Sequence, residues 1–500
     1  MNIFKKNNLF LLFVIVLGLM LRLYKINIPL LEFYPSRQIQ TADIARNFFK
    51  TDLNILHPAV SYFGARNTSF LIEFPGYNYL VSLLYFVFEV HEVIGRLISV
   101  LAWLVSIIFI YKIVLKLGTK TIANISCLFY SLSPLSILIS RSFQPDQLMI
   151  AFSLAGIYYF LKWNKENDIV SLLLSVGFVS ISVLLKLPSV IFTFLPIFLF
   201  ILINKRNRVK PLLIYITCII VPTFLWYGYA YIQRQSSAIT VGGFSLSTWF
   251  GFDVFLNPNY YLYIFGFEYN LVLLPIGIIL FVIGIFQKLK PSQRFLYFWL
   301  GGVFVYFLVF NKHNMTHEYY HLPILPIAVL FVGIAGEKVW TAIYTKFVSK
   351  GILIFILVFT ICLLMIIPTL QRAYKPIDRF SYVITTAAKI KSVTKPSDPI
   401  IGSMDSGPSL VYYSNRNGWQ FAVNREDTET KFNFYGVKNL KTIDSIDELN
   451  NLRQQGAVIF ASANKSQFVA SGAFANYMYS NYPVIEDDGN SIIFSLINVK

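Results

Sequence analysis

Charged residues are scarce in this chain. Only 13% of its 500 residues are Asp, Glu, Lys or Arg, against about 25% in an ordinary soluble domain. Cysteine is scarcer still, and Cys127, Cys218 and Cys362 all fall inside apolar runs. Neither a disulfide framework nor a cysteine metal site is therefore expected. The shortage of charge also argues against a soluble globular enzyme.

What fills the chain is apolar sequence. Hydrophobic residues make up 56% of it, and 47 Phe and 31 Tyr exceed what one water-soluble core buries. Apolar runs of about 18 residues or more indicate membrane-spanning helices. We therefore predict an α-helical polytopic membrane protein with about eleven spans. The predicted spans lie at roughly 8–27, 93–115, 121–139, 147–163, 169–186, 189–204, 211–231, 271–287, 294–310, 322–340 and 351–369.

The positive charge of the chain has a topological explanation. Basic residues outnumber acidic ones by 42 to 25, and they gather in alternate loops, such as Lys205–Lys210 and Lys338–Lys350. Because cytoplasmic loops carry the excess of Lys and Arg, these loops are expected inside and no nucleic acid need be invoked. The N-terminal run has no small-residue cleavage site after it, so we read it as a retained helix. We predict a multi-pass plasma-membrane protein with a cytoplasmic N-terminus and an extracytoplasmic C-terminal domain.

This topology sends three long segments to the outer side, at 28–92, 232–270 and beyond about 371. We predict a membrane domain over 1–370, with the extracytoplasmic loop 28–92, and a soluble extracytoplasmic α/β domain over 371–500. The tail is polar and has signals of its own. Strands are predicted at Pro399–Met404, Leu410–Tyr413, Ala457–Ala461 and Ile492–Leu496, and a helix at Ser445–Gln455, where Ser445 and Glu448 make a capping box.

The loop 28–92 is long for a simple connector, which favours a functional role. Its Ala42–Phe49 part has helical character. Glu32 follows the first span closely, and Glu73 precedes a second amphipathic stretch, so both carboxylates are expected near the membrane surface. There a carboxylate binds a metal or an acceptor hydroxyl, although a solvated loop carboxylate is the simpler reading of either one. Arg66 lies between them in an aromatic and polar segment.

Two further groups of candidates lie at the outer ends of later spans. Pro145 marks a helix start that places Asp146 in a first turn, where the helix dipole favours an acid. Arg141 either binds a phosphate or pairs with Asp146, and Lys186, at a helix end, either binds a phosphate or snorkels. His317 and His321 share a helical face. They make a zinc site only with further ligands, and interfacial packing beside Tyr319 and Tyr320 is the alternative.

Several words in the sequence, taken in order, carry a family resemblance. They are RQIQTADIARNF, EFPGYNYL, GRLIS, SPLSILISRSFQPDQLM and HEYYHLPILP. Together they resemble the GT-C membrane glycosyltransferases, and within these the bacterial branch of family 39, which contains protein O-mannosyltransferases and aminoarabinose transferases. The resemblance covers roughly residues 10–330. Each of these segments is weak evidence by itself, whereas the five in this order are fairly specific for the family.

The resemblance implies an activity and partners. Such enzymes take a polyprenyl-phosphate sugar as donor and transfer the sugar with inversion, at the outer face of the bilayer, to a protein, lipid or glycan acceptor. The family's key Asp early in the first loop corresponds to Glu32. If the ADIAR word is aligned instead, Arg37 takes that place and no acid remains there. Glu73 matches the acid before a proline that helps to hold phosphate or metal, and Asp146 matches an acid at the start of the fourth helix.

The chemistry of the resemblance requires a cation for the leaving phosphate and a carboxylate for the acceptor proton. Outer-face cations are Arg37, Arg66, Arg141 and Lys186, with a divalent metal ion as the alternative. We expect Glu32, Glu73 and Asp146 to share one outer pocket, with a cation among them because like charges repel. The rival hypotheses are a glycan polymerase or ligase, a transporter or flippase, and a non-catalytic accessory subunit. The scarcity of charge within the predicted spans disfavours a transporter.

Overall fold

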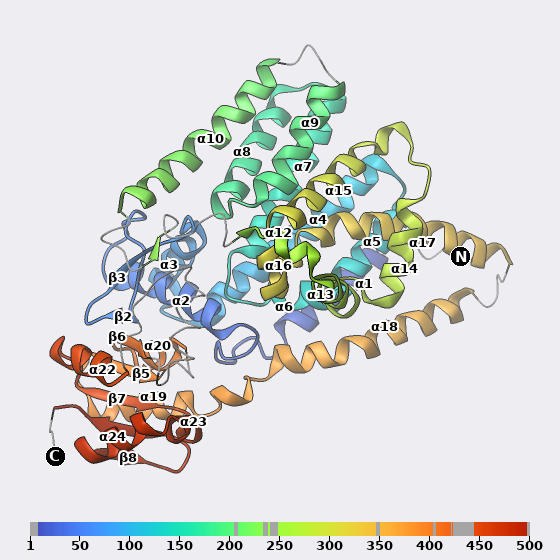
Figure 1. Ribbon diagram of the computed structural model, residues 1–500. Coiled ribbons are helices and arrows are strands. Elements are labelled where there is room, and N and C mark those ends of the chain that lie inside the picture. Colours follow the sequence, from blue (N-terminus) through green and yellow to red (C-terminus); the bar gives the residue numbers. More distant parts are fainter. Residues whose placement is uncertain are drawn as a thin grey trace. The chain divides into compact units, whose positions relative to one another are not determined.

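The computed structural model describes residues 9–204, 209–233, 239–240, 249–346, 351–403, 407–421, 423 and 445–497. It divides into two compact units (Figure 1). Unit 1 comprises Met1–Ile26, Arg96–Tyr227 and Leu246–Tyr374, and unit 2 comprises Asn27–Gly95, Gly228–Ser245 and Lys375–Lys500.

Unit 1 is helical throughout its described part. Its α-helices are α1 (Leu9–Leu23), α4 (Glu92–Leu117, which begins in unit 2), α5 (Lys120–Leu132), α6 (Pro134–Ser140), α7 (Asp146–Glu166), α8 (Ile169–Leu185), α9 (Leu195–Asn204), α10 (Val209–Ile232, which ends in unit 2), α12 (Phe252–Leu256), α13 (Pro258–Phe267), α14 (Leu274–Ile285), α15 (Phe295–Val309), α16 (Asn311–Thr316), α17 (Ile324–Lys346) and α18 (Gly351–Tyr374). Short 3₁₀ or π segments are η1 (Val190–Phe194), η4 (Glu268–Val272), η5 (Pro291–Gln293) and η6 (Glu318–His321).

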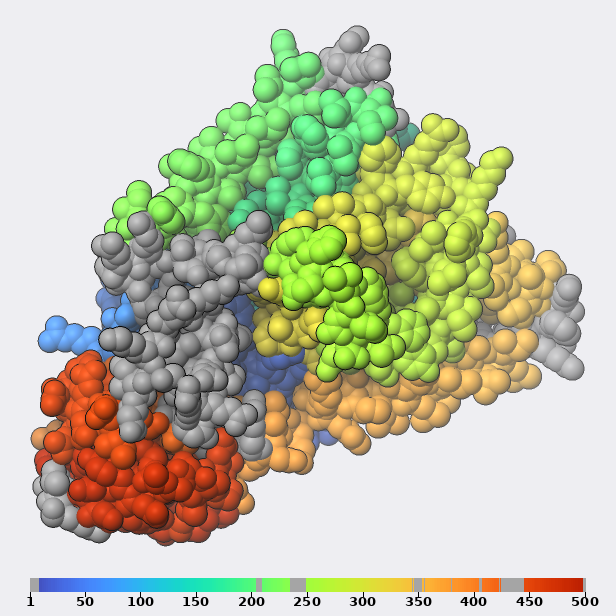
Figure 2. Space-filling model, in the orientation of Figure 1, coloured from blue at the N-terminus to red at the C-terminus, as the bar shows by residue number. Residues whose placement is uncertain are grey.

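These helices have the length and composition of membrane spans in several cases. Among the described residues, five helices are long and apolar enough to cross a bilayer, or up to seven if each of two bent helix pairs counts as one span. The outermost ones, α10 and α18, have only 17% and 22% of their apolar windows buried, and both lie along the surface in Figure 2. A helix occupies each of the eleven predicted ranges. The polytopic helical fold class is thus confirmed, while the count of eleven spans stays a prediction.

Local sequence explains how the helices near the candidate residues begin and end. The Thr119 hydroxyl accepts from Ile122 N at the start of α5, and Asp168 accepts from Ser171 N at the start of α8. Ser133 separates α5 from α6, which begins at Pro134, and the two helices are bent by 64°. The buried Arg22 of α1 supports that bend by donating to Ser131 O.

Unit 2 combines the first loop with the C-terminal tail. The loop contributes α2 (Pro35–Lys50), β1 (Ala59–Val60), β2 (Phe63–Gly64), β3 (Thr68–Leu71) and α3 (Gly76–Phe88), and β4 (Ile239–Thr240) comes from the middle of the chain. The tail contributes η7 (Asp378–Phe380), α19 (Val383–Val393), β5 (Ile400–Ser403), α20 (Ser409–Ser414), β6 (Gly418–Phe421), α22 (Ser445–Gln454), β7 (Ile459–Ser462), α23 (Lys465–Ala470), α24 (Ala473–Asn481), β8 (Val484–Asp487) and β9 (Ile492–Ser495). The predicted helical character of Ala42–Phe49 is confirmed by α2.

The described strands of unit 2 form two sheets. The larger one has the order β2-β6-β5-β7-β9-β8, with β6, β5 and β7 parallel and the other pairs antiparallel. The smaller one has the order β1-β3-β4. An apolar core that includes Phe421, Phe460 and Phe494 lies under the larger sheet. Because β2 belongs to the first loop and pairs with β6, that sheet includes residues far upstream of 371. That residues 371–500 fold as an independent domain therefore stays a proposal, because the sheet also includes a strand from the first loop.

The tail confirms some predicted elements and corrects one. Strands lie at three of the predicted places, as β5, β7 and β9, and the predicted helix is α22. The predicted strand at Leu410–Tyr413 is wrong, because these residues form α20. A short apolar run does not distinguish a strand from a buried helical turn. Here Gly407, with a φ of 53°, and Pro408 turn the chain just before the helix, and Leu410 and Val411 pack against Gly402 of β5.

Candidate active site

An ion pair between two buried side chains forms the centre of the candidate site in unit 1. Asp146 begins α7 after Pro145, as predicted, and Lys186 directly follows the end of α8 at Leu185. Lys186 Nζ lies 2.7 Å from Asp146 Oδ1, and the two side chains are only 8% and 4% exposed. The other oxygen, Oδ2, has no hydrogen-bond partner among the residues that the structure describes. This carboxylate therefore keeps an acceptor position for a ligand.

Aromatic rings from η6 surround the lysine of this pair. The centroids of Tyr319 and Tyr320 lie 5.2 and 5.9 Å from Lys186 Nζ, within the range of cation–π attraction. The Tyr306 hydroxyl donates to Tyr320 O at 3.0 Å, which fixes the turn to α15. Tyr319 and Tyr320 thus pack on Lys186, while the interfacial position that was the alternative for this segment stays a prediction.

The two histidines of the same segment have different surroundings. His321 is fully buried, and its ring lies between Glu268 Oε1 at 2.8 Å and the Asn314 carbonyl at 2.9 Å. Both of its nitrogens therefore already have protein partners. His317 stacks on Tyr319, with ring centroids 5.2 Å apart. In the described part of the chain, no three His, Cys, Asp or Glu side chains come together as a metal-binding group, so the metal role of His317 and His321 stays a prediction.

Arg141 lies in a different environment from the one expected. Its guanidinium donates to the carbonyls of Ala373, Tyr24 and Lys25, the last two at 3.1 and 3.0 Å. It also stacks on Tyr374, 4.6 Å from the ring centroid. Arg141 therefore links the ends of α1 and α18, and Lys186 is the residue that pairs with Asp146.

Unit 2 contains the second set of candidates. Arg37, in the first turns of α2, makes an ion pair with Glu73, and their side chains are 17% and 28% exposed. Glu32 is 2% exposed, and its Oε1 lies 3.4 Å from Gln38 Nε2. The same amide donates to the Phe33 carbonyl at 2.7 Å, so Gln38 holds the turn that presents Glu32. Arg66 is exposed near β3. A half-buried ion pair and a buried carboxylate thus come from the same loop.

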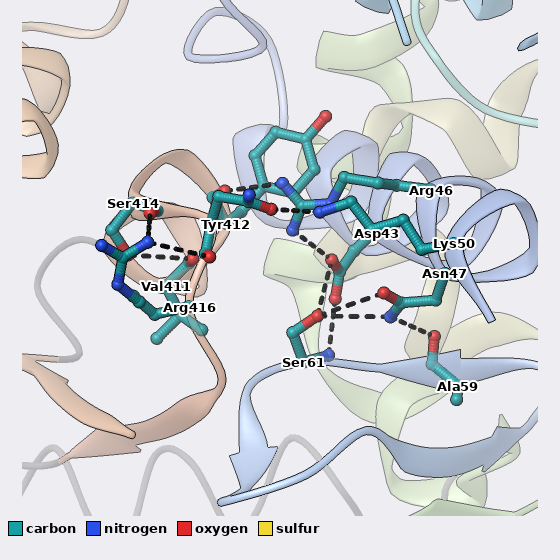
Figure 3. Close-up of polar contacts among 11 residues, drawn as sticks. Asp43, Arg46, Asn47, Lys50, Ala59, Ser61, Val411, Tyr412, Ser414 and Arg416 are labelled. Carbon is teal, nitrogen blue, oxygen red and sulfur yellow. Dashed lines mark hydrogen bonds and ion pairs between the residues drawn. The ribbon is translucent and has the colours of Figure 1, made fainter. Parts of the chain in front are cut away.

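Figure 3 shows a third carboxylate of unit 2, Asp43, whose oxygens are both used by the protein. Oδ1 accepts from Arg46 Nη2 at 2.6 Å and from the Ser61 hydroxyl at 3.0 Å, and Oδ2 accepts from Ser61 N at 2.6 Å. Arg46 lies between Asp43 and Tyr412, donating to the Tyr412 carbonyl at 2.8 Å and stacking on its ring. This cluster ties α2 to β1 and to α20.

A tyrosine of the tail also contacts the first loop inside unit 2. The Tyr413 hydroxyl accepts from Leu30 N at 2.6 Å and donates to Glu92 Oε2 at 3.3 Å. Burial, reinforced by the neighbouring Glu92 and Glu32, raises the pKa of Tyr413 well above its usual value. The Tyr413 hydroxyl therefore stays neutral, and the residue that it binds, Leu30, lies two positions before Glu32 in the chain.

Sequence reasoning identified most of these residues and missed some partners. Asp146 with Lys186, and Arg37 with Glu73, are brought together, each pair within one unit. The predicted common pocket for the acids of both units stays a prediction. Arg46 and Tyr413 were not predicted site residues, and Asp43 was only the carboxylate to test next if Glu32 proved dispensable. The ADIAR word contains Asp43 and Arg46 at a spacing of three, which was a signal for an intrahelical pair, whereas nothing in the sequence indicated Tyr413.

Comparison with known proteins matches part of the chain to a family. Residues 73–227 match the family described as dolichyl-phosphate-mannose-protein mannosyltransferase. A search among curated proteins finds no match to this sequence. The matched segment is less than half of the chain, and it includes Glu73, Arg141, Asp146 and Lys186.

Solved structures match over nearly the full length. ArnT from Cupriavidus metallidurans bound to undecaprenyl phosphate has a TM-score of 0.65 at 12% identity, covering 98% of each chain. The oligosaccharyltransferase of Archaeoglobus fulgidus in complex with Zn and sulfate has a TM-score of 0.60 at 11% identity, covering 95% of this chain and 71% of that one. The mycobacterial arabinofuranosyltransferase AftD has a TM-score of 0.54 at 11% identity, covering 98% of this chain and 40% of that one.

At these identities the likeness to solved structures concerns the fold. The overall fold is shared with ArnT, the oligosaccharyltransferase and AftD, and the family match adds sequence evidence over 73–227. The predicted resemblance is confirmed: this chain is a membrane protein with the GT-C glycosyltransferase fold and a segment like family 39.

Proposed function

We propose that this chain is an inverting glycosyltransferase that uses a polyprenyl-phosphate sugar as donor. It transfers the sugar to a protein, lipid or glycan acceptor at the outer face of the plasma membrane. The GT-C fold over nearly the whole chain, joined to the mannosyltransferase match over 73–227, carries the proposal. The solved relatives support the donor class, because one holds undecaprenyl phosphate and another holds dolichol phosphate together with an inhibitory peptide.

The reaction needs two protein functions. An acceptor hydroxyl attacks the anomeric carbon of the donor sugar, and the bond between that carbon and the phosphate oxygen breaks. Polyprenyl phosphate leaves with the electron pair, and a carboxylate takes the acceptor proton. A cation close to the phosphate stabilises the negative charge of the leaving group.

We assign the cation role first to Lys186. Its ammonium is held by Asp146 and by the rings of Tyr319 and Tyr320, so its position is fixed before a ligand binds. Asp146 keeps one oxygen that has no partner in the described part of the chain, and we assign it to an acceptor or sugar hydroxyl. Arg37, and then Arg66, are further candidates for phosphate contacts, whereas Arg141 is engaged by three backbone carbonyls.

We assign the proton-accepting role to Glu32 and the support of the cation to Glu73. Glu32 is buried at the start of the first loop, where Gln38 fixes the adjoining turn. Glu73 pairs with Arg37 of α2. A base held in a dry site needs no reorganisation when the reaction occurs.

A divalent metal ion is the alternative source of positive charge. One solved relative is a complex with Zn, and His317 and His321 remain the metal candidates. The described residues do not bring three such ligands together, and His321 already has partners on both ring nitrogens. The proposed mechanism therefore uses Lys186 and Arg37 as its cations.

The test uses the full-length protein in detergent with radiolabelled polyprenyl-phosphate sugars and measures donor consumption. Glu32→Gln should lower turnover by about 10²–10⁴-fold, the usual loss on removing a general base. Glu89→Gln, at an exposed position next to α3, is the matched control and should turn over like the wild type. Near wild-type turnover of Glu32→Gln would remove Glu32 from the mechanism. A wild type that consumes no donor from a broad panel would count against transferase activity.

One observation favours a second candidate, a non-catalytic sugar-lipid-binding subunit. On the ADIAR alignment Arg37 stands where the family has its acid, and here it is neutralised by Glu73. Such a subunit would bind polyprenyl-phosphate sugars without consuming them. Arg37→Asp would then be expected to create turnover, whereas for an enzyme that uses Glu32 it should reduce turnover.

The topology and domain proposals have separate tests. Tags in the Lys205–Lys210 loop, much of which lies outside the described residues, should be cytoplasmic, and tags after Lys375 extracytoplasmic. Both tags on one side would contradict the eleven-span topology. The fragment 371–500 should be soluble and folded without transferase activity. Because β2 covers the edge of β6, adding the loop 28–92 should raise the melting temperature of that fragment.

A further inference from the structure

Unit 1 contains a cavity that the residues discussed above do not fill. Its volume is about 590 Å³, within the range of small-molecule sites. One wall is a single face of α13 and the adjoining η4, where Asn259, Tyr263, Phe267 and Asn270 recur at helical spacing. Figure 2 shows the α12–α13 segment in yellow-green, uncovered on the face toward the viewer.

An ion pair forms another part of the lining. Glu318 of η6 accepts from Arg372 of α18 at 3.0 Å, with the glutamate side chain 12% exposed and the arginine side chain 50% exposed. Of the described residues that line the cavity, the others carry no charge. Glu318 balances the charge of Arg372, so this wall carries no net charge, and a neutral ligand fits it without any further counter-charge.

The chemistry of the lining fits one class of neutral ligand. Amides at both ends and a carboxylate–guanidinium pair supply hydrogen-bond donors and acceptors, and Tyr263 and Phe267 supply ring faces whose centroids are 6.4 Å apart. A sugar ring has hydroxyls on its rim and an apolar C–H face, so it satisfies both kinds of wall. A hydrocarbon chain would make no hydrogen bonds with the polar part of this lining.

The turn η6 connects this cavity to the Asp146–Lys186 pair. Glu318 faces the cavity, whereas the next two residues, Tyr319 and Tyr320, pack on Lys186. His321, which closes the turn, is bound to Glu268 at the start of η4. A phosphate held at Lys186 and a sugar held in the cavity would thus contact neighbouring residues of one short turn.

We infer that this cavity is a sugar-binding subsite that takes one neutral monosaccharide ring, from the donor or from a glycan acceptor. The inference rests on the proposed function for its biological role, although its binding test does not require turnover.

The test fills the cavity without straining the helix. A Cβ added to Gly266, on the cavity wall, meets no atom within 4 Å, and the same is true of Gly301 on α15 outside the cavity. Gly266→Leu places its side chain at the cavity, and Gly301→Leu is the matched control. Leucine has a higher helix propensity than glycine, so both variants should be as thermally stable as the wild type.

The probes are farnesyl phosphate, farnesyl-phosphate monosaccharides (mannose, glucose, galactose and arabinose) and the p-nitrophenyl glycosides of the same sugars. Dissociation constants are measured with the full-length protein in nanodiscs. If the cavity binds the donor sugar, Gly266→Leu should raise the dissociation constant of a farnesyl-phosphate sugar about ten-fold or more and leave that of farnesyl phosphate unchanged. If the cavity binds the acceptor sugar, the same variant should raise the dissociation constant of a p-nitrophenyl glycoside to a similar extent and leave those of the farnesyl-phosphate sugars unchanged.

Two results would overturn the inference. The first is that Gly266→Leu and Gly301→Leu bind every probe with the same constants. The second is that the wild type binds no sugar-bearing probe more tightly than its sugar-free counterpart, farnesyl phosphate or p-nitrophenol. A wild type that binds sugars through the cavity but consumes no donor would reject the transferase function and keep the subsite.

Discussion

Each unit buries an aspartate beside a basic side chain, and the two units use that pair differently. In unit 2, Asp43 receives three donors from Arg46 and Ser61, which occupy both of its oxygens. In unit 1, Asp146 receives Lys186 on one oxygen, and the other has no partner in the described part of the chain. Both carboxylates are 3% exposed or less.

The contrast shows that burial beside a cation does not by itself indicate a site. A buried carboxylate whose acceptor positions are all filled by its own chain holds elements together, as Asp43 holds α2, β1 and α20. A buried carboxylate with an acceptor position left over is able to take a ligand. The same criterion makes Asp43 a poor replacement for Glu32 as the catalytic base.

The largest effect on turnover is expected from neutralising the Asp146–Lys186 pair. Asp146→Asn with Lys186→Gln replaces the ion pair by a neutral pair of similar size, so the melting temperature should change little. Turnover should fall by about 10²-fold or more, because the charge that faces the phosphate is lost. The control is Lys116→Gln with Glu166→Gln, which neutralises a more exposed pair of the same unit. Unchanged turnover in the Asp146–Lys186 double variant would make that pair structural.

Asp43→Asn should act on stability. It leaves the Arg46 guanidinium buried without its counter-charge, which costs about 3–5 kcal/mol, and the melting temperature should fall clearly. Turnover per folded molecule should remain close to that of the wild type. Asp52→Asn, at an exposed position of the same loop, is the control. A stable but inactive Asp43→Asn protein would move Asp43 into the catalytic site and reverse the comparison.

Tyr413→Phe tests a smaller contact of unit 2. The hydroxyl bonds to Leu30 N and to Glu92, so its loss should cost about 1 kcal/mol. Because burial, aided by Glu92, raises the pKa of Tyr413, this group stabilises the fold fully below the usual tyrosine pKa of about 10. Its contribution declines as the pH rises above that value. Melting temperatures of wild type and variant should therefore differ at pH 7 and converge above pH 10, and a constant gap would contradict the pKa shift.

The smallest effect is expected from a surface pair of the tail. A hydrogen bond from Lys389 lowers the pKa of the Asp488 carboxyl, which is bound at 2.8 Å. A depressed folded pKa means that the stabilisation is present above the usual aspartate value of about 4 and is lost as the pH falls below it. Lys389→Ala should therefore lower stability by about 0–1 kcal/mol at pH 7 and have less effect at pH 3. An effect larger at pH 3 would contradict this sign.

Some of the fold and site could be predicted because the signals are local. The helix at Asp146 follows from Pro145, and α2 follows from Ala42–Phe49, since each rests on neighbouring residues. The helix α20 was mistaken for a strand because its apolar run is too short to show a period. The strand β2 was not predicted because two residues, Phe63 and Gly64, carry no strand signal without their partner β6.

The sequence by itself determined that this protein is a helical membrane protein with a polar α/β tail. The physical reason is that long apolar runs are stable in a bilayer whatever their neighbours. Only the tertiary structure decided which charge serves which carboxylate. Lys186 pairs with Asp146 from 40 residues away along the chain, while the nearer Arg141 caps backbone carbonyls. Once water is excluded, each buried charge must pair with the group that the packed helices bring to it. The distance between two residues along the sequence does not predict that pairing.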